Sequence, residues 1–314
     1  MKKREAADSI TDAMCYDYFI TRREGRKVYD RRHKPFEFKP YDGKTPIVLE
    51  DRIRVQCGLK HKNILRKLFQ DEIDKTLVHI GSQWVNTMSL MKDYEERKTD
   101  PHKFLKYWVM FYRPSQYSPS PSIYSPQVSL AIMIYYNFKG HILTPTMGWG
   151  TWLMAAAHNP AISTYHGIDV IPSVITKSKT FANELGQAAT FHCKPSEDIK
   201  STELRPADSI IFSPPYFQLE IYPDDGNLVQ STERYKEIDK WIEGYWEPTV
   251  KLCKDTLKDD GTMCVIFKQD KDGGMMLDVL ENYFDIFDRK PLMGGGAKTA
   301  INPETLYACR KKSA

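Results

Sequence analysis

From residue 141 to the end of the chain, short apolar runs alternate with segments of helical periodicity. Short apolar runs bounded by turn residues are typical of buried strands, whereas apolar residues at helical spacing predict helices. Alternating strands and helices form βαβ units, with helices on both faces of a mainly parallel sheet. The pattern therefore predicts an α/β fold of the Rossmann-like class. The expected strands are 141–145, 163–170, 189–193, 208–215 and 261–268, with further apolar runs at 284–287 and 304–311, and the expected helices are 151–157, 172–185 and 233–257.

The N-terminal third of the chain lacks this alternation. The residues before Lys62 are charged and are interrupted by proline and glycine, which predicts irregular structure. Apolar residues at helical spacing follow from Lys62 to Ile80, and an aromatic-rich helix is expected from Pro101 to Phe111. The proline- and serine-rich segment from Arg113 to Pro126 is expected to be a linker. We therefore predict a mostly helical or irregular extension over 1–112 and an α/β domain over 113–314.

The composition suits a folded globular protein rather than a membrane protein. Hydrophobic residues make up 41% of the chain and aromatic residues 12%, and the mean hydropathy is −0.52. The longest apolar run, Leu130–Tyr136, is far shorter than the roughly 20 residues that cross a bilayer. The amino terminus is basic but has no apolar stretch of the secretory kind. We therefore expect a cytoplasmic protein that is not secreted and does not bind a membrane.

The cysteines give no sign of a metal centre or a disulfide framework. The six are widely spaced, none forms a Cys-x-x-Cys pair, and no histidine lies at metal-ligand spacing from one of them. We expect reduced, mostly buried thiols and no metal site.

Positive charge is concentrated near the N-terminus. The formal net charge is only +4, but the segment from Arg22 to Lys67 holds 15 Lys and Arg against 6 acidic residues. Such a segment is suited to contact the phosphate backbone of a nucleic acid. A solvated basic surface without a partner would have the same composition, so the segment is a candidate DNA contact and both interpretations stay open.

A glycine-containing turn and an acidic residue predict a nucleotide-type cofactor site. The turn Met147–Thr151, with Gly148 and Gly150, follows an expected strand and opens an expected helix, so a ligand can approach the backbone closely. Asp169 ends the next strand, where an acid can accept hydrogen bonds from both ribose hydroxyls of an adenosine-containing cofactor. The third glycine of the dinucleotide fingerprint is missing, so no pyrophosphate is implied. As an alternative, Asp169 would only cap the helix that begins near Pro172.

The tetrad Ser213-Pro214-Pro215-Tyr216 closes the fourth expected strand, where ligands of open α/β sheets bind. The Ser213 hydroxyl and the Pro214 carbonyl can accept hydrogen bonds from an amino group, and Tyr216 can stack on a flat ring. Holding the amine in this way leaves its nitrogen lone pair directed at a methyl donor, which is catalysis by positioning. The alternative is a turn that merely ends a strand.

With the glycine turn, this tetrad resembles the amino-methyltransferases that modify N4 of cytosine or N6 of adenine in DNA. Their signatures are a (D/N/S)PP(Y/F) tetrad and an FxGxG-type loop, and SPPY is more similar to the cytosine-N4 branch. The resemblance covers roughly residues 113–311 and is strongest to the methylases of bacteriophages and mobile elements. It implies a Rossmann-like fold, S-adenosylmethionine as cofactor, a bacterial or host cell as location, and Ser213, Pro214, Pro215 and Tyr216 as catalytic residues. The cofactor-binding residues that it implies are Tyr124, Pro126, Thr144, Gly148, Gly150, Thr151, Asp169, Ser196 and Glu197.

Two departures from the family pattern keep other functions open. Thr144-Pro145-Thr146 stands where the family usually has Asp-Pro-Phe, so an acid that helps to hold the methionine end of the cofactor is replaced by a hydroxyl. No target-recognition domain is evident, which would leave sequence reading to the N-terminal region or to a partner protein. The alternatives are an RNA methyltransferase, or an inactive protein of this fold that serves as a nucleic-acid-binding or assembly subunit.

Overall fold

The computed structural model describes residues 47–49, 53–55, 65, 68–80, 83–85, 123–217, 220–222, 230–268, 271–292 and 304–312. The chain divides into two compact units. The larger unit comprises Lys39–Gln70, Ser122–Gln218 and Pro223–Ala314, and the smaller comprises Met1–Phe38, Asp71–Pro121 and Leu219–Tyr222.

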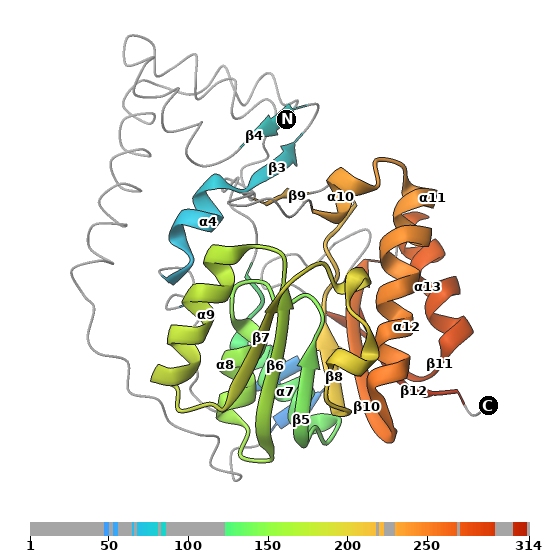
Figure 1. Cartoon of the computed structure of the whole chain (residues 1–314). Helices are drawn as coiled ribbons and strands as arrows, with labels where there is room; N and C mark the ends of the chain where they lie inside the picture. The colour runs from blue at the N-terminus through green and yellow to red at the C-terminus, as the bar shows by residue number, and fades with distance from the viewer. Residues whose placement is uncertain are drawn as a thin grey trace, which may run out of the picture. The chain divides into compact units, whose positions relative to one another are not determined.

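The larger unit is built on a seven-stranded mixed sheet (Figure 1). The strands lie in the order β11-β12-β10-β8-β5-β6-β7. Strands β5, β6, β7, β8 and β10 run parallel, whereas β12 is antiparallel to both β10 and β11. The strands are β5 (Gly140–Thr144), β6 (Ile162–Asp169), β7 (Ala189–Cys193), β8 (Ala207–Phe212), β10 (Leu257–Lys268), β11 (Phe284–Leu292) and β12 (Glu304–Lys311).

The order of the strands creates a switch point between β5 and β8. From β5 the chain moves outward through β6 to β7 and then returns to β8, on the other side of β5. In open α/β sheets, ligands bind outside the carboxyl ends of the strands at such a point. The loops that follow Thr144 and Phe212 therefore flank the expected ligand site.

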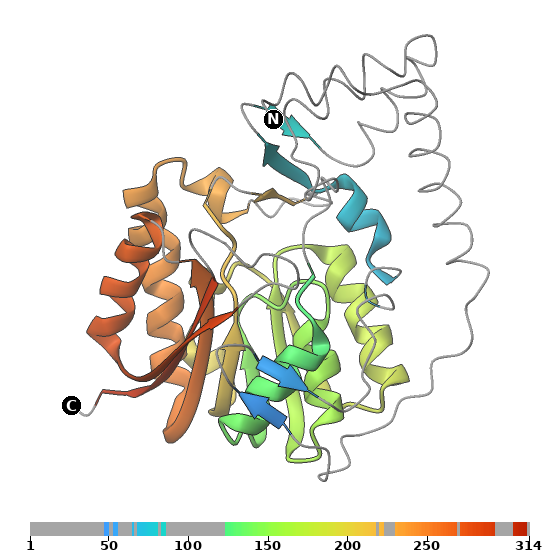
Figure 2. The same ribbon diagram turned by 180° about the vertical axis from the view of Figure 1, so that it is seen from behind.

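Helices cover both faces of this sheet (Figures 1 and 2). Helices α12 (Glu247–Thr256) and α13 (Lys271–Tyr283) pack on one face, and α7 (Pro126–Tyr135) and α8 (Thr151–His158) lie on the opposite face. Helix α9 (Pro172–Glu184) packs against β6 and β7. The α/β class predicted from the alternation of strands and helices is confirmed.

The predicted helix over 62–80 is wrong at its C-terminal end. Helix α4 (Gln70–Lys75) stops before β3 (Leu77–Ile80), which pairs antiparallel with β4 (Gln83–Val85). The backbone groups of β3 find partners across the hairpin, and periodicity within a single segment does not reveal such partners. Strand β3 also pairs with β9 (Glu220–Ile221), so the smaller unit contains a three-stranded antiparallel sheet.

The single helix predicted over 233–257 is interrupted. Helix α10 (Ser231–Arg234) ends before α11 (Ile238–Trp241), which continues through a π turn (Ile242–Trp246) into α12. Pro248 lies in the first turn of α12 and has no N–H to donate to the preceding turn, so the helix widens into a π turn before it. Helix α13 was not predicted, because two glycines near its start lower its helix propensity.

The remaining N-terminal predictions are tested only in part. Where irregular structure was expected, β1 (Ile47–Leu49) and β2 (Ile53–Val55) form a hairpin that contacts α7. The expected helix at 101–111 and the expected boundary between 112 and 113 lie outside the described residues and stay predictions. In the described part of the chain, no helix is long and apolar enough to cross a membrane.

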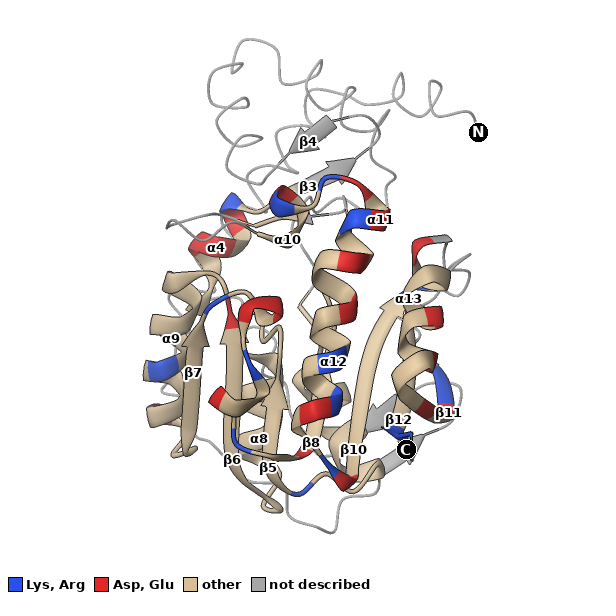
Figure 3. Cartoon of the chain, turned by 45° about the vertical axis from the view of Figure 1, so that its right-hand side comes forward, with Lys and Arg blue, Asp and Glu red and all other residues tan. Residues whose placement is uncertain are grey.

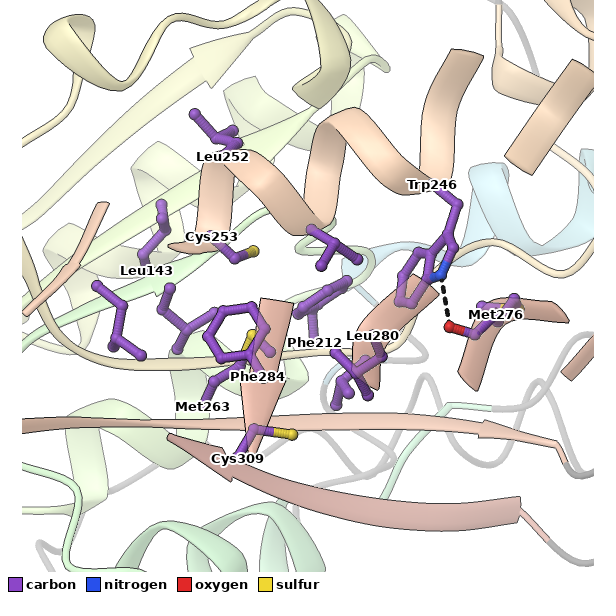
Figure 4. Packing of buried hydrophobic residues seen from close by; sticks show 14 of the residues in the cluster. Leu143, Phe212, Trp246, Leu252, Cys253, Met263, Met276, Leu280, Phe284 and Cys309 are labelled. Atoms are coloured by element: carbon purple, nitrogen blue, oxygen red, sulfur yellow. Dashed lines mark hydrogen bonds between the residues drawn. The ribbon is translucent and has the colours of Figure 1, made fainter. Parts of the chain in front are cut away.

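The main hydrophobic core lies between the sheet and helices α12 and α13 (Figure 4). Trp246 and Phe212 are fully buried there, with ring centroids 6.1 Å apart. The Trp246 indole N–H donates a hydrogen bond of 2.9 Å to the Met276 carbonyl of α13, which joins the end of the π turn to the neighbouring helix.

We expect Trp246→Phe to lower the free energy of unfolding by about 2 kcal/mol, because it removes this buried hydrogen bond and part of the packed volume. Urea unfolding measures the change. Phe287→Leu is the control, because Phe287 is 44% exposed and its replacement is expected to change stability by less than about 0.5 kcal/mol. Equal stability of Trp246→Phe and the wild type would contradict this account of the core.

Three histidines lie side by side on neighbouring strands of the sheet. The His166 ring stacks on His192, with centroids 4.8 Å apart, and meets the His141 ring edge-on at 5.9 Å. Burial, and to a smaller extent the neighbouring His192 and His141, lower the pKa of His166 to about 4. The native sheet therefore holds His166 in its neutral form.

The lowered pKa of His166 predicts that the native state becomes less stable in mild acid. Its pKa in the unfolded chain is near 6.5, so between pH 6.5 and about 4 the unfolded state binds a proton that the native state does not. The free energy of unfolding is expected to fall as the pH is lowered through this range, by up to about 1.4 kcal/mol per pH unit. His166→Leu should flatten the slope in urea unfolding between pH 7 and pH 4, and an unchanged slope would refute the assignment.

Candidate active site

The glycine turn follows β5 at the switch point. Gly148 and Gly150 have φ values of 54° and 76°, in the left-handed region that favours glycine. A Cβ at Gly150 would come within 3.2 Å of the Phe69 ring, whereas a Cβ at Gly148 would meet no atom within 4 Å. The turn is therefore closed by packing at Gly150 and open at Gly148.

Asp169 lies at the carboxyl end of β6, beside this turn. Its carboxylate accepts hydrogen bonds from the backbone N–H groups of Gly148, at 3.0 Å, and Ile171, at 3.1 Å. The helix-cap alternative does not describe this residue, since Ile171 occupies the N-cap position of α9. Burial raises the pKa of Asp169 to about 6, although the backbone hydrogen bonds oppose the shift. A carboxylate offers about four lone-pair sites, and the backbone N–H groups of Gly148, Ile171 and Val170 leave part of that capacity for another donor.

The tetrad Ser213–Tyr216 leaves the carboxyl end of β8 and is tied to the loop after β5. The Thr146 hydroxyl donates a hydrogen bond of 2.9 Å to the Ser213 carbonyl across the switch point. The Tyr216 hydroxyl donates one of 2.7 Å to Glu304, and the Lys268 ammonium lies 5.1 Å from the centroid of the Tyr216 ring. Tyr216 is thus held at its hydroxyl and next to one ring face.

Tyr124 joins the segment before α7 to the same cluster. Its hydroxyl donates a hydrogen bond of 2.6 Å to Glu304, and its backbone carbonyl accepts one of 3.2 Å from the Thr151 hydroxyl at the start of α8. Its ring centroid lies 5.4 Å from that of Trp152. Pro126 is buried at the first turn of α7, where its missing N–H has no helical partner to lose.

Ser196 and Glu197 lie in the 3₁₀ turn Ser196–Asp198 after β7. The Ser196 hydroxyl is buried and shares a hydrogen bond of 3.0 Å with the Thr249 hydroxyl of α12. Glu197 accepts a hydrogen bond of 2.9 Å from Arg234, and its pKa is raised because it is largely buried. Both side chains thus have protein partners on the α10–α12 side of the sheet.

Thr144, the hydroxyl that stands in place of the family's acid, is fully buried at the end of β5. Its hydroxyl faces that of Tyr165 on β6, which is also buried. A threonine at this position therefore lies within the sheet layer, where a charged carboxylate without a cationic partner would be costly.

Most of the predicted site residues meet at one edge of the sheet, namely the glycine turn with Asp169, the tetrad, and Tyr124 with Thr151. Ser196 and Glu197 instead bond to residues of α12 and α10, and Thr144 faces Tyr165. Sequence reasoning missed Thr146 and Glu304. Thr146 stands within the same Thr-Pro-Thr run that marks the departure from the family, but Glu304 gave no local signal, because only the antiparallel pairing of β12 with β10 brings it to this edge.

Two further features of the described residues concern possible metal ligands and the distribution of charge. Among the described residues, no group of three or more His, Cys, Asp or Glu side chains could hold a metal ion. Along α11 and α12, lysine residues are interspersed with Asp and Glu (Figure 3). Most of the basic segment between Arg22 and Lys67 lies outside the described residues, so its expected contact with DNA stays a prediction.

No protein-family model and no curated protein matches the chain. Among solved structures, TrmN from Thermus thermophilus is 12% identical over 60% of this chain, with a TM-score of 0.42, and this chain covers 49% of its length. An S-adenosylmethionine-dependent methyltransferase from Clostridium acetobutylicum ATCC 824 is 11% identical, with 67% of this chain and 98% of that chain covered and a TM-score of 0.44. An rRNA methylase from Streptococcus thermophilus is 13% identical, with 62% and 100% covered and a TM-score of 0.40. These are similarities of fold alone.

Proposed function

We propose that the protein is an S-adenosylmethionine-dependent methyltransferase that methylates the exocyclic amine of a DNA base. One observation carries the proposal: the glycine turn and the Ser-Pro-Pro-Tyr tetrad flank the same switch point and are joined by the hydrogen bond from Thr146 to the Ser213 carbonyl. A cofactor held by the turn would therefore face a substrate held by the tetrad.

The residues at the turn fit an adenosine-containing cofactor. Asp169 lies beside an open Gly148 and its carboxylate keeps acceptor capacity beyond its backbone hydrogen bonds, so it can accept a hydrogen bond from the ribose of the cofactor. Gly148, Gly150 and Thr151 would line the pocket, with Tyr124 and Pro126 on the side of α7. When bound, S-adenosylmethionine supplies a methyl group on a sulfonium centre.

The tetrad suits a flat ring that bears an amino group. The Ser213 hydroxyl and the Pro214 carbonyl would accept the two N–H hydrogen bonds of the amine, which orients the nitrogen lone pair toward the methyl donor. Tyr216 would stack on the target base after the base has been flipped out of the DNA double helix. While Lys268 covers one ring face, the base must stack on the other. Cytosine N4 is the favoured target and adenine N6 the next.

The test is transfer of a labelled methyl group from S-adenosylmethionine to double-stranded DNA, single-stranded DNA and RNA offered in parallel. The proposal requires label in DNA that is lost in Ser213→Ala, because alanine cannot accept a hydrogen bond from the amine. Label in RNA alone would assign a different substrate class. Cofactor binding without label in any nucleic acid would overturn the proposal.

A further inference from the structure

Glu304 is the point at which the two sides of the candidate site meet. It is the first residue of β12 and pairs with Lys268, the last residue of β10. Its Oε2 accepts the hydrogen bond from Tyr124 and its Oε1 accepts the hydrogen bond from Tyr216, at 2.6 and 2.7 Å. One carboxylate therefore connects the cofactor-side segment before α7 with the tetrad after β8.

Both phenols remain protonated donors in this arrangement. Burial raises the pKa of Tyr124 and of Tyr216 well above the usual value, and the negative charge of Glu304 raises each further. A protonated phenol has one hydrogen to give. Because each gives that hydrogen to Glu304, each phenol oxygen is left to accept a hydrogen bond from another group.

Tyr216 is therefore fixed at its hydroxyl by a carboxylate that lies outside the tetrad. Lys268, the residue that pairs with Glu304, places its ammonium 5.1 Å from the centroid of the same ring. The orientation of the ring that is proposed to stack on the base thus depends on Glu304 and not on the tetrad alone.

We propose that Glu304 is a positioning residue for methyl transfer: by accepting a hydrogen bond from each phenol, its carboxylate holds Tyr216 for stacking and ties it to the cofactor-side segment at Tyr124. The inference rests on the proposed function and adds to it a residue far from the tetrad in sequence.

Glu304→Gln tests these two hydrogen bonds at nearly constant shape. The amide oxygen can accept from one phenol, but the amide nitrogen can only donate, so the second tyrosine loses its acceptor. We expect kcat to fall about 10- to 100-fold, the effect of losing a hydrogen bond to a charged group. The dissociation constant for S-adenosylmethionine should change less than about threefold, because Thr151 holds the Tyr124 backbone independently.

The chain offers a matched control in Glu247. It accepts a hydrogen bond of 2.8 Å from the Tyr283 hydroxyl on the outer helices α12 and α13, outside the candidate site. Glu247→Gln should therefore leave kcat unchanged. Glu304→Asp keeps the charge and should recover part of the activity that Glu304→Gln loses. Full kcat in Glu304→Gln, or equal losses in both glutamine variants, would overturn the inference.

A double-mutant cycle separates this inference from the proposed function. Urea unfolding of Glu304→Gln, Tyr216→Phe and the double variant measures the coupling between the two side chains without any assay of activity. A measurable coupling together with the loss of kcat supports the positioning role, and additive effects on stability refute the contact itself. If the coupling is present but the wild type methylates no nucleic acid, the contact stands, and the positioning role falls together with the proposed function.

Discussion

Replacement of Tyr216 by alanine is expected to lower kcat/KM for methyl transfer to DNA by about 10³- to 10⁴-fold. Stacking of a base on an aromatic ring is worth roughly 1–3 kcal/mol, and a misplaced reacting group costs a further factor of about 10². The variant also removes one of the two phenols that bond Glu304. Steady-state kinetics with DNA as the varied substrate measure the loss.

Cofactor binding should survive this change, because Asp169 and the glycine turn do not depend on the Tyr216 ring. Calorimetry should give a dissociation constant for S-adenosylmethionine within about threefold of the wild-type value, in keeping with the additivity of separate sites. Tyr283→Ala serves as a control for the loss of a tyrosine bonded to a glutamate outside the site. Wild-type activity in Tyr216→Ala would remove the tetrad from the catalytic account.

Asp169→Ala is expected to weaken the binding of S-adenosylmethionine by about 100-fold or more, since each hydrogen bond to a charged group contributes about 1.5–3 kcal/mol. The carboxylate would bond the ribose, and it also holds the backbone N–H of Gly148 at the open side of the turn. Calorimetric titration at pH 7.5 measures the change. Binding as tight as in the wild type would place the cofactor elsewhere.

The same residue predicts the pH dependence of cofactor binding. Because the pKa of Asp169 in the free protein is about 6, the carboxylate is ionised above that value and protonated below it. Ribose hydroxyls donate to the ionised form, so affinity should be constant from pH 7 to 8 and fall as the pH drops below 6, by up to about tenfold per unit. Asp169→Asn, which does not titrate, should bind weakly and without this dependence.

The larger unit was largely predictable because its central strands, such as β5 and β8, are buried on both faces. Such strands contain short apolar runs, and the helices between them begin at identifiable residues, such as Thr151 after the glycine turn and Pro172 at the start of α9. The errors occur where partners are distant in sequence or where the helix geometry changes. Strand β3 depends on a hairpin partner, and the segment 233–257 contains a π turn ahead of Pro248.

The candidate site was predictable where its residues follow strand ends. Gly148, Asp169 and Ser213 each stand at the carboxyl end of a parallel strand, so topology alone brings them to one edge. Glu304 is different, because it begins a strand. Only the antiparallel insertion of β12 beside β10 carries that residue to the carboxyl edge, and no periodicity or motif in the sequence indicates the insertion.

The most direct measurement is nucleoside mass spectrometry of DNA incubated with the protein and isotopically labelled S-adenosylmethionine. The account predicts a labelled methyl group on an exocyclic amine, as N4-methylcytosine or, in second place, N6-methyladenine, and its absence when Tyr216→Ala replaces the wild type. Unmodified nucleosides after incubation with a protein that binds the cofactor, or a methyl group on a ring carbon, would contradict it.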